Sequence, residues 1–118
     1  MLMVKLESLK KSNQFRKVLK EKKIHTDYFS IFAAKNFIKH KHRANLNISF
    51  VMKKKIGNAV KRNKIRRKLK AITQQLLKKK GAINTDYTYI VFGKSNAYIQ
   101  KHNVLLLSME KSFSKLKK

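Results

Sequence analysis

The sequence predicts a single α+β domain, because segments with the two-residue period of strands alternate with segments that have the 3.6-residue period of helices. Three segments are helical and three are strand-like, in the order α-β-β-α-β-α. The chain has 118 residues, which suits one domain over residues 1–118. Hydrophobic residues make up 42% of it, so we expect a packed core that needs no disulfide or structural metal.

The N-terminal half combines a short helix with two strands. A helix is predicted over residues 12–22, where Phe15 and Val18 fall on one face. Residues 27–37 are aromatic, β-branched and alternating, which predicts a strand. Residues 46–53 alternate even more clearly and predict a second strand. We expect these two strands to pair with each other as a hairpin.

The C-terminal half contains a long helix, a strand and a closing helix. The long helix is predicted from Asn58 to Lys80 by an apolar stripe. The stripe consists of Ile65, Leu69, Ile72 and Leu76. Gly81 stands where a left-handed C-terminal cap is expected, and residues 86–93 predict the third strand. Asn103 is the candidate cap of the closing helix. Its apolar positions are Leu106, Met109, Phe113 and Leu116.

Charge is the most extreme feature of the chain. Lys and Arg number 31 against 5 Asp and Glu, a formal net charge of +26, and no acidic residue lies between Asp27 and Asp86. A polyanionic partner would relieve this self-repulsion, which indicates nucleic acid. The absence of Cys excludes disulfides and Cys-based zinc sites. No apolar run approaches the roughly 20 residues of a membrane span, and no signal peptide is evident, so we expect a cytoplasmic protein.

The segment KKKIGNAVKRNKIRRKLK, residues 53–70, concentrates this charge on one predicted helix. With Ile65 facing the core, Asn63 and Arg67 point outward, and cations occupy both flanks. Gly57 allows a sharp turn before the helix, whose free N–H groups suit phosphate. A solvated surface is the ordinary alternative, but a helix that is merely soluble would mix both signs of charge. The segment therefore favours an RNA- or DNA-binding function.

This segment resembles the signature of the protein subunit of bacterial ribonuclease P. Members of that family have a strand ending in Val-Ser-Lys-Lys, then Val/Ile-Gly-Asn-Ala-Val, then Arg-Asn-Arg-Ile-Lys-Arg on a helix. Residues 56–60 and Arg62-Asn63 match as they stand. The chain departs at Met52-Lys53, where the family has Val-Ser, and at Lys64, which keeps the charge of the family's Arg but loses its bidentate fork. The order of the other predicted elements is similar over nearly the whole chain.

The resemblance implies a two-layer α/β sandwich, in which a mixed four-stranded sheet packs with three helices in the order α-β-β-β-α-β-α. It also implies a left-handed β-α-β crossover around the basic helix, against the general right-handed rule. The pattern of the sequence predicts only three strands, so the fourth comes from the family. Residues 38–45 and 94–100 are its candidate positions.

The function that the resemblance implies is assistance to a catalytic RNA, which removes the 5′ leader of precursor tRNA and generates the mature 5′ end. The partners would be that RNA and precursor tRNA, and no protein partner or membrane is evident. The RNA-based holoenzyme would require magnesium, with no cofactor bound by protein side chains. The few acidic residues are scattered, whereas two-metal hydrolysis needs paired carboxylates, so we expect the protein not to be the catalyst.

The resemblance also implies two sets of contact residues. Contacts to the catalytic RNA would come from Lys53, Lys54, Lys55, Asn58, Lys61, Arg62, Asn63, Lys64, Arg66 and Arg67. The cleft for the single-stranded leader would contain Phe15, Phe32, Arg66 and Lys70. Aromatic faces for base stacking and cations for the backbone are what single-stranded RNA needs. Core packing is the alternative role for both Phe residues.

Three other functions are consistent with these features. A ribosomal protein would share the size and charge but has no need of the Gly-Asn-Ala-Val-x-Arg-Asn pattern. A self-sufficient metal-dependent nuclease would cleave RNA without an RNA subunit. A nonspecific packaging protein would bind duplex DNA as well as structured RNA.

Overall fold

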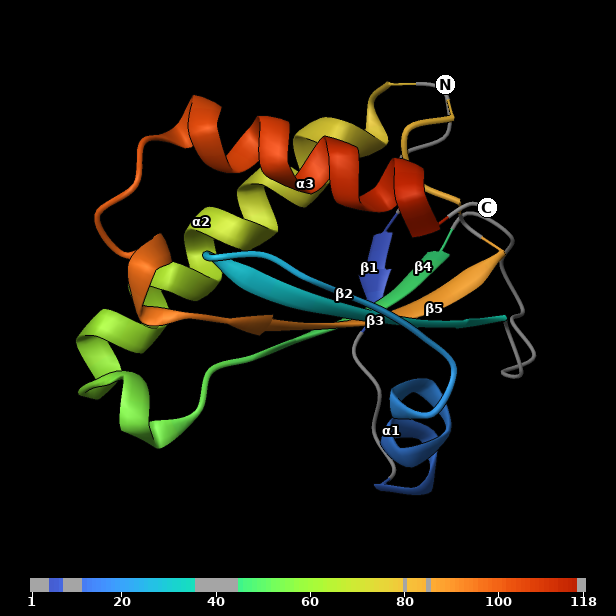
Figure 1. Ribbon diagram of the computed structural model, residues 1–118, viewed down its shortest axis with the longest axis horizontal. Helices are drawn as coiled ribbons and strands as arrows, with labels where there is room; N and C mark the ends of the chain where they lie inside the picture. The colour runs from blue at the N-terminus through green and yellow to red at the C-terminus, as the bar shows by residue number, and fades with distance from the viewer. Residues whose placement is uncertain (1–4, 8–11, 36–44, 80, 85, 117–118) are drawn as a thin grey trace.

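A mixed β-sheet with helices on both faces forms the body of the molecule (Figure 1). The computed structural model describes residues 5–7, 12–35, 45–79, 81–84 and 86–116. The helices are α1 (Ser12–Leu19), α2 (Ala59–Leu77) and α3 (His102–Leu116). The strands are β1 (Lys5–Glu7), β2 (Lys22–His25), β3 (Phe29–Lys35), β4 (Asn45–Val51) and β5 (Tyr87–Gly93). Two 3₁₀ turns are η1 (Lys54–Ile56) and η2 (Ser95–Ala97).

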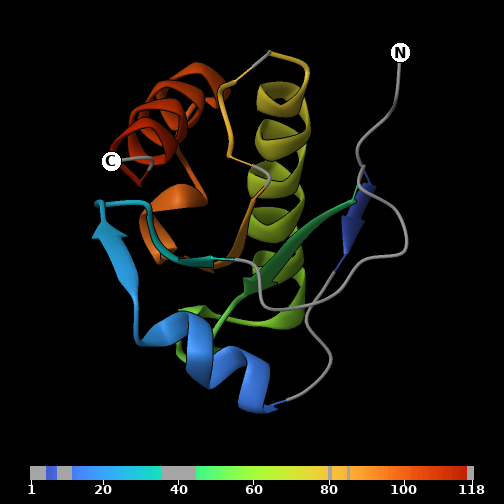
Figure 2. The ribbon, with the colours of Figure 1, turned by 90° about the vertical axis from the view of Figure 1, so that its right-hand side faces the viewer.

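The strand order in the sheet is β1-β4-β5-β3-β2. β4 runs parallel to β5, and β3 is antiparallel to both β5 and β2. The predicted α+β class and the mixed sheet with three helices are therefore confirmed, and the elements from α1 to α3 follow the order α-β-β-β-α-β-α. β1 adds a three-residue parallel strand beside β4, at the edge of the sheet (Figure 2). The left hand of the β4-α2-β5 crossover stays a prediction.

Two predictions about the strands were wrong. β3 and β4 do not form a hairpin, because β5 lies between them and pairs with both. The fourth strand is β2, at Lys22–His25, whereas residues 95–97 form η2; residues 38–44 lie outside the described residues. Only every second residue of β2 is even partly buried, so this basic edge strand lacks the apolar signal of a core strand. The helix predicted over residues 12–22 ends already at Leu19, because β2 begins at Lys22.

The main core lies between the sheet and the layer of α2 and α3 (Figure 1). All four predicted stripe residues of α2 are buried, as expected. In α3 the predicted positions Met109, Phe113 and Leu116 are buried, whereas Leu106 only borders the core and its neighbour Leu105 is fully buried instead. The helix begins at His102, which places Asn103 inside its first turn and not before it. Gly81 does adopt a left-handed conformation (φ +79°), but it follows the C-cap residue Lys78 by three positions.

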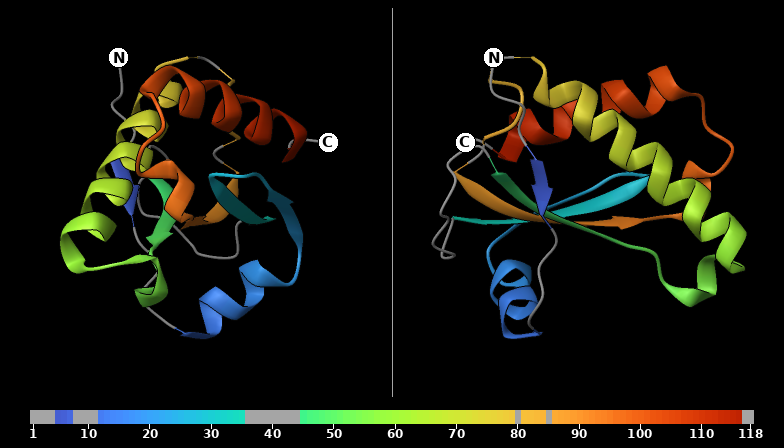
Figure 3. Two further views of the ribbon diagram at one scale, coloured as in Figure 1. Left: turned by 60° about the vertical axis from the view of Figure 1, so that its left-hand side comes forward. Right: turned by 180° about the vertical axis from the view of Figure 1, so that it is seen from behind.

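Of the described helices, α1 alone lies on the opposite face of the sheet, as both views in Figure 3 show. Val18 of α1 is buried against Ala34 and Ile90, and this forms a second, small apolar cluster. The eight-residue α1 is too short to cover the whole face. Aromatic side chains at its margin, Phe32 and Phe92, consequently remain only partly buried.

Candidate nucleic-acid interface

A pocket of about 620 Å³ occupies the part of this face that α1 leaves open. Leu19 of α1 forms one wall, and η1 and the segment after β5 form the other. The lining consists of Leu19, His25, Ser30, Phe32, Lys53, Lys55, Ile56, Phe92, Gly93, Lys94 and Ser95. The pocket is thus an apolar floor with basic side chains at its rim.

The floor is built by residues that stand next to each other on neighbouring strands. His25 pairs with Ser30 across β2 and β3, and Ser30 pairs with Phe92 across β3 and β5. The rings of Phe32 and Phe92 meet edge to face at 5.5 Å, and His25 meets Phe32 in the same way at 5.8 Å. A 2.6 Å hydrogen bond joins His25 Nδ1 and Ser30 Oγ. Aromatic rings held in this manner form a stable surface on which a base can stack.

The rim is cationic. Lys53 Nζ lies 5.6 Å from the centre of the Phe92 ring, and the side chains of Lys53 and Lys55 are exposed. Lys94 Nζ donates to the carbonyl oxygen of Thr26 at 2.6 Å, which fixes it beside the pocket. A strand of RNA whose bases reach the floor would therefore meet lysines along its backbone.

The chain passes from the pocket into α2 through a sharp turn. Gly57 has φ +154°, a backbone conformation that favours glycine, and a Cβ atom there would also displace the flexible stem of Lys61, whose Cδ lies 2.8 Å away. Asn58 is the N-cap of α2, and its Oδ1 accepts from the backbone N–H of Lys61 at 2.9 Å. The structure thus gives Asn58, a predicted RNA contact, a structural role at the start of the helix.

The remaining predicted RNA contacts form the outer surface of α2 and η1. Asn63 and Arg67 are exposed, as the helical period predicts, and Asn63 Oδ1 accepts from Arg66 Nη1 at 2.9 Å. Arg62 is half-buried, and its Nε has no hydrogen-bond partner among the described residues. Lys61 and Lys64 lie beside Tyr98, which comes from the segment after β5. These side chains present hydrogen-bond donors, and the sequence contains no Asp or Glu from residue 28 to residue 85 that could pair with them locally.

The residues predicted for the leader cleft are divided between the two faces of the sheet. Phe15 and Phe32 both pack against the small cluster around Val18, and Phe32 also lines the pocket. Arg66 and Lys70 lie on α2, which packs on the other face of the sheet, and neither of them lines the pocket. The structure instead places Phe32 near lysines that the sequence assigned to the catalytic RNA.

His25, Phe92 and Lys94 are among the pocket residues that the sequence did not predict. The alternation of the third predicted strand could have identified Phe92, because it points away from the buried Tyr89 and Val91. His25 and Lys94 gave no comparable signal, because their position depends on where β2 and η2 pack.

A model of the ribonuclease P family matches residues 3–117 of the chain. The chain belongs to the ribonuclease P protein family. The resemblance to the protein subunit of the bacterial enzyme is thereby confirmed. Membership places this ribonuclease P protein in tRNA processing and implies an RNA partner.

Solved structures of ribonuclease P proteins share the fold. The Staphylococcus aureus protein matches with a TM-score of 0.71 and 24% identity, over 93% of this chain and 94% of that one. A mutant of that protein with defective mRNA degradation activity matches with a TM-score of 0.74 and 24% identity, over 93% of this chain and 87% of the mutant. The Thermotoga maritima protein matches with a TM-score of 0.63 and 23% identity, over 93% of this chain and 94% of that one. A search of curated proteins found no match.

One departure from the ribonuclease P pattern has a clear structural basis. Met52, where the family has Val, is buried, and its side chain fills the space next to Gly93. A Cβ atom on Gly93 would come within 2.8 Å of Cε of Met52 and 2.9 Å of Cγ2 of Ile65, besides touching Met52 Sδ. The larger residue just after β4 is thus accommodated by the absence of a side chain at the end of β5.

Proposed function

We propose that this ribonuclease P protein binds the catalytic RNA of the holoenzyme through α2 and the 5′ leader of precursor tRNA through the pocket. It thereby promotes removal of the leader and generation of the mature tRNA 5′ end in the cytoplasm. The observation that carries this proposal is the continuity of the two surfaces, since η1 lines the pocket and leads directly into α2.

The pocket suits a single strand and not a duplex. Its floor offers the aromatic rings of Phe32 and Phe92, on which unpaired bases can stack for about 1–3 kcal/mol each. Lys53, Lys55 and Lys94 stand around it at positions where phosphates of the same strand would pass. The leader is the single-stranded part of precursor tRNA, so this geometry supports leader binding. Leu19 forms one wall where the family often has an aromatic residue, and stacking on that side should be weaker.

The surface of α2 suits folded RNA. Its outward residues combine arginine forks, a lysine row and the amide of Asn63, which are donors for phosphate oxygens and ribose hydroxyls. Arg62 is half-buried, and its buried Nε has no hydrogen-bond partner among the described residues. Such a surface screens the repulsion between catalytic RNA and substrate.

We assign hydrolysis to the RNA subunit. The described residues include no group of three or more His, Asp, Glu or Cys side chains that could hold a metal ion, so they do not fit a two-metal site. The magnesium of the holoenzyme would then be held by RNA. In the part of the chain that the structure describes, no helix is long and apolar enough to cross a membrane.

The test is cleavage of precursor tRNA at low magnesium by a bacterial ribonuclease P RNA, with the protein present, absent or alone. We expect strong stimulation by the protein and no cleavage by the protein alone. Cleavage by the protein alone would favour a self-sufficient nuclease. No stimulation, with tight binding to ribosomal RNA, would favour a ribosomal protein, and equal binding to duplex DNA would favour a packaging protein.

A second experiment tests the α2 surface. Arg62→Ala or Asn63→Ala should weaken binding of the catalytic RNA about 10- to 100-fold, the value of one hydrogen bond to a charged group. Lys111→Ala on α3 is the matched control, because Lys111 is exposed and lies outside both predicted contact sets. Unchanged RNA binding by both α2 variants would refute the assignment of this surface.

A further inference from the structure

Lys68 of α2 binds the backbone of the segment after β5. Nζ of Lys68 donates to three backbone carbonyl oxygens, those of Ala97 at 3.2 Å, Tyr98 at 2.7 Å and Gln100 at 3.0 Å. An ammonium group has three N–H donors, so these contacts use its whole capacity. Lys68 is therefore a cation of the basic helix that is engaged within the protein and is not available to a phosphate.

Burial and the neighbouring Lys64 both lower the pKa of Lys68, the burial more strongly. Placing this cation here is thus unfavourable in itself. Hydrogen bonds to the three carbonyl oxygens offset the cost of burying the charge. The same bonds fix the position of residues 95–100 on the helix.

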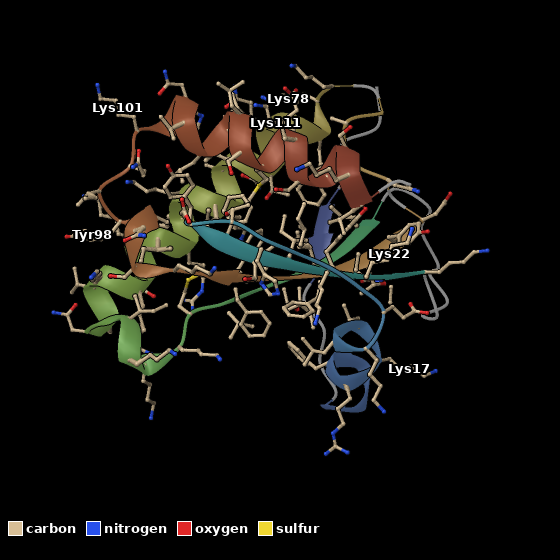
Figure 4. The ribbon with its side chains drawn as sticks, viewed as in Figure 1. Lys17, Lys22, Lys78, Tyr98, Lys101 and Lys111 are labelled. Atoms are coloured by element: carbon tan, nitrogen blue, oxygen red, sulfur yellow. The ribbon has the colours of Figure 1, made fainter. Side chains whose placement is uncertain are left out.

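The fixed turn brings the ring of Tyr98 to two lysines of the family motif. Nζ of Lys64 lies 4.9 Å from the ring centre and Nζ of Lys61 lies 5.3 Å from it. Lys61 Nζ also donates to Ser95 Oγ at 2.8 Å. Figure 4 shows Tyr98 on the side of the molecule where the N-terminal half of α2 lies. Two mobile side chains are in this way restricted to one place.

We propose that Tyr98, Lys61 and Lys64 form a composite contact surface for the phosphate backbone of the catalytic RNA, and that Lys68 is its positioning residue. This inference rests on the proposed function of α2. An aromatic ring attracts cations without neutralising them, unlike a carboxylate, so both lysines keep their full charge for a phosphate. The ring also restricts Lys64, which lacks the rigid fork of the arginine that the family has at this position.

The experiment measures the affinity of the full-length protein for a bacterial ribonuclease P RNA at one salt concentration. Lys68→Met keeps the packing of the stem and removes the three donors, and Tyr98→Leu removes the ring without changing the charge. We expect each to weaken binding about fivefold, and Lys68→Met to weaken it more than the charge-matched control Lys111→Met. Circular dichroism spectra should show that the variants are folded.

Coupling distinguishes a positioning role from a general loss of charge or stability. Lys64→Met should weaken binding of the wild-type protein several-fold more than it weakens binding of the Tyr98→Leu protein. Equal effects in both backgrounds would overturn the proposal. So would a loss caused by Tyr98→Leu that is confined to precursor over mature tRNA, because the surface would then face the leader.

Failure of this inference can be told from failure of the proposed function. If Arg62→Ala weakens RNA binding while Lys64 and Tyr98 act independently, only the composite surface is refuted. If neither Arg62→Ala nor Lys64→Met affects RNA binding, α2 is not the RNA-binding helix and both proposals fall.

Discussion

At the scale of single residues, the contact between Met52 and Gly93 shows how closely the main core is packed. Both residues line one site between β5, the end of β4 and α2, where Ile65 completes the contact. Neither side chain is assigned a contact with RNA, yet their packing brings β5 close to α2.

Gly93→Ala should destabilise the protein by about 1–3 kcal/mol, because the added methyl group has no room beside Met52 and Ile65. Urea denaturation would measure the free energy of unfolding. The double variant Gly93→Ala/Met52→Val should lose less than the sum of the two single variants, since the smaller side chain makes room. Additive losses would show that the steric conflict lies elsewhere.

Phe32→Ala tests the pocket at the same scale. We expect assembly with the catalytic RNA to be spared and the preference for precursor over mature tRNA to fall by about 1–3 kcal/mol, the value of one stacked base. Val18→Ala is the matched control, because Val18 is buried in the same small cluster but does not line the pocket. An equal loss of affinity for both tRNAs would give Phe32 a purely structural role.

At the scale of elements, α2 depends on its first turn. The cap by Asn58 and the turn at Gly57 both stand immediately before the surface that we assign to RNA. Mutation of Asn58 could therefore weaken RNA binding in two ways, by disturbing the start of α2 or by removing a direct contact to RNA.

Replacement of Asn58 separates these causes. Asn58→Ala should lower the free energy of unfolding by about 0.5–2 kcal/mol, because the N–H of Lys61 loses its acceptor. Asn58→Ser should retain most of the stability, since serine also caps. If the serine variant is stable and still loses affinity for the catalytic RNA, Asn58 contacts RNA in addition to capping.

Across the whole molecule, cationic side chains come from every layer of the fold. Figure 4 shows Lys17 on α1, Lys22 on β2, and Lys78, Lys101 and Lys111 along the layer of α2 and α3. The net charge of +26 thus creates a positive field around the entire protein. Among the described residues, the arrangement at α2 and the pocket distinguishes the proposed RNA interface from this background.

Affinity for the catalytic RNA should fall steeply with salt, by about 10³-fold between 50 and 200 mM monovalent salt if six phosphates are contacted. Filter binding or fluorescence anisotropy over this range gives the slope. Arg62→Ala should make the slope shallower by about one unit, whereas Lys111→Ala should leave it nearly unchanged. A wild-type slope near zero would contradict an electrostatic interface.

The sequence by itself determined the local features of this protein. The stripe of α2, the strand character of β3, β4 and β5, and the outward direction of Asn63 and Arg67 all follow from periodicity, which depends on near neighbours. The motif in residues 53–70 also sufficed for the family resemblance. These features could be predicted because each is encoded within one helix or one strand.

Tertiary structure alone decided how these parts combine. β5 separates β3 from β4 because it pairs with both, a choice between partners distant in sequence that no local pattern expresses. The pocket joins His25, Phe32, Lys53 and Phe92 for the same reason, and Lys68 is withdrawn from the basic surface by carbonyl groups about 30 residues away. Pairing and packing compare whole surfaces, and only the folded chain brings those surfaces together.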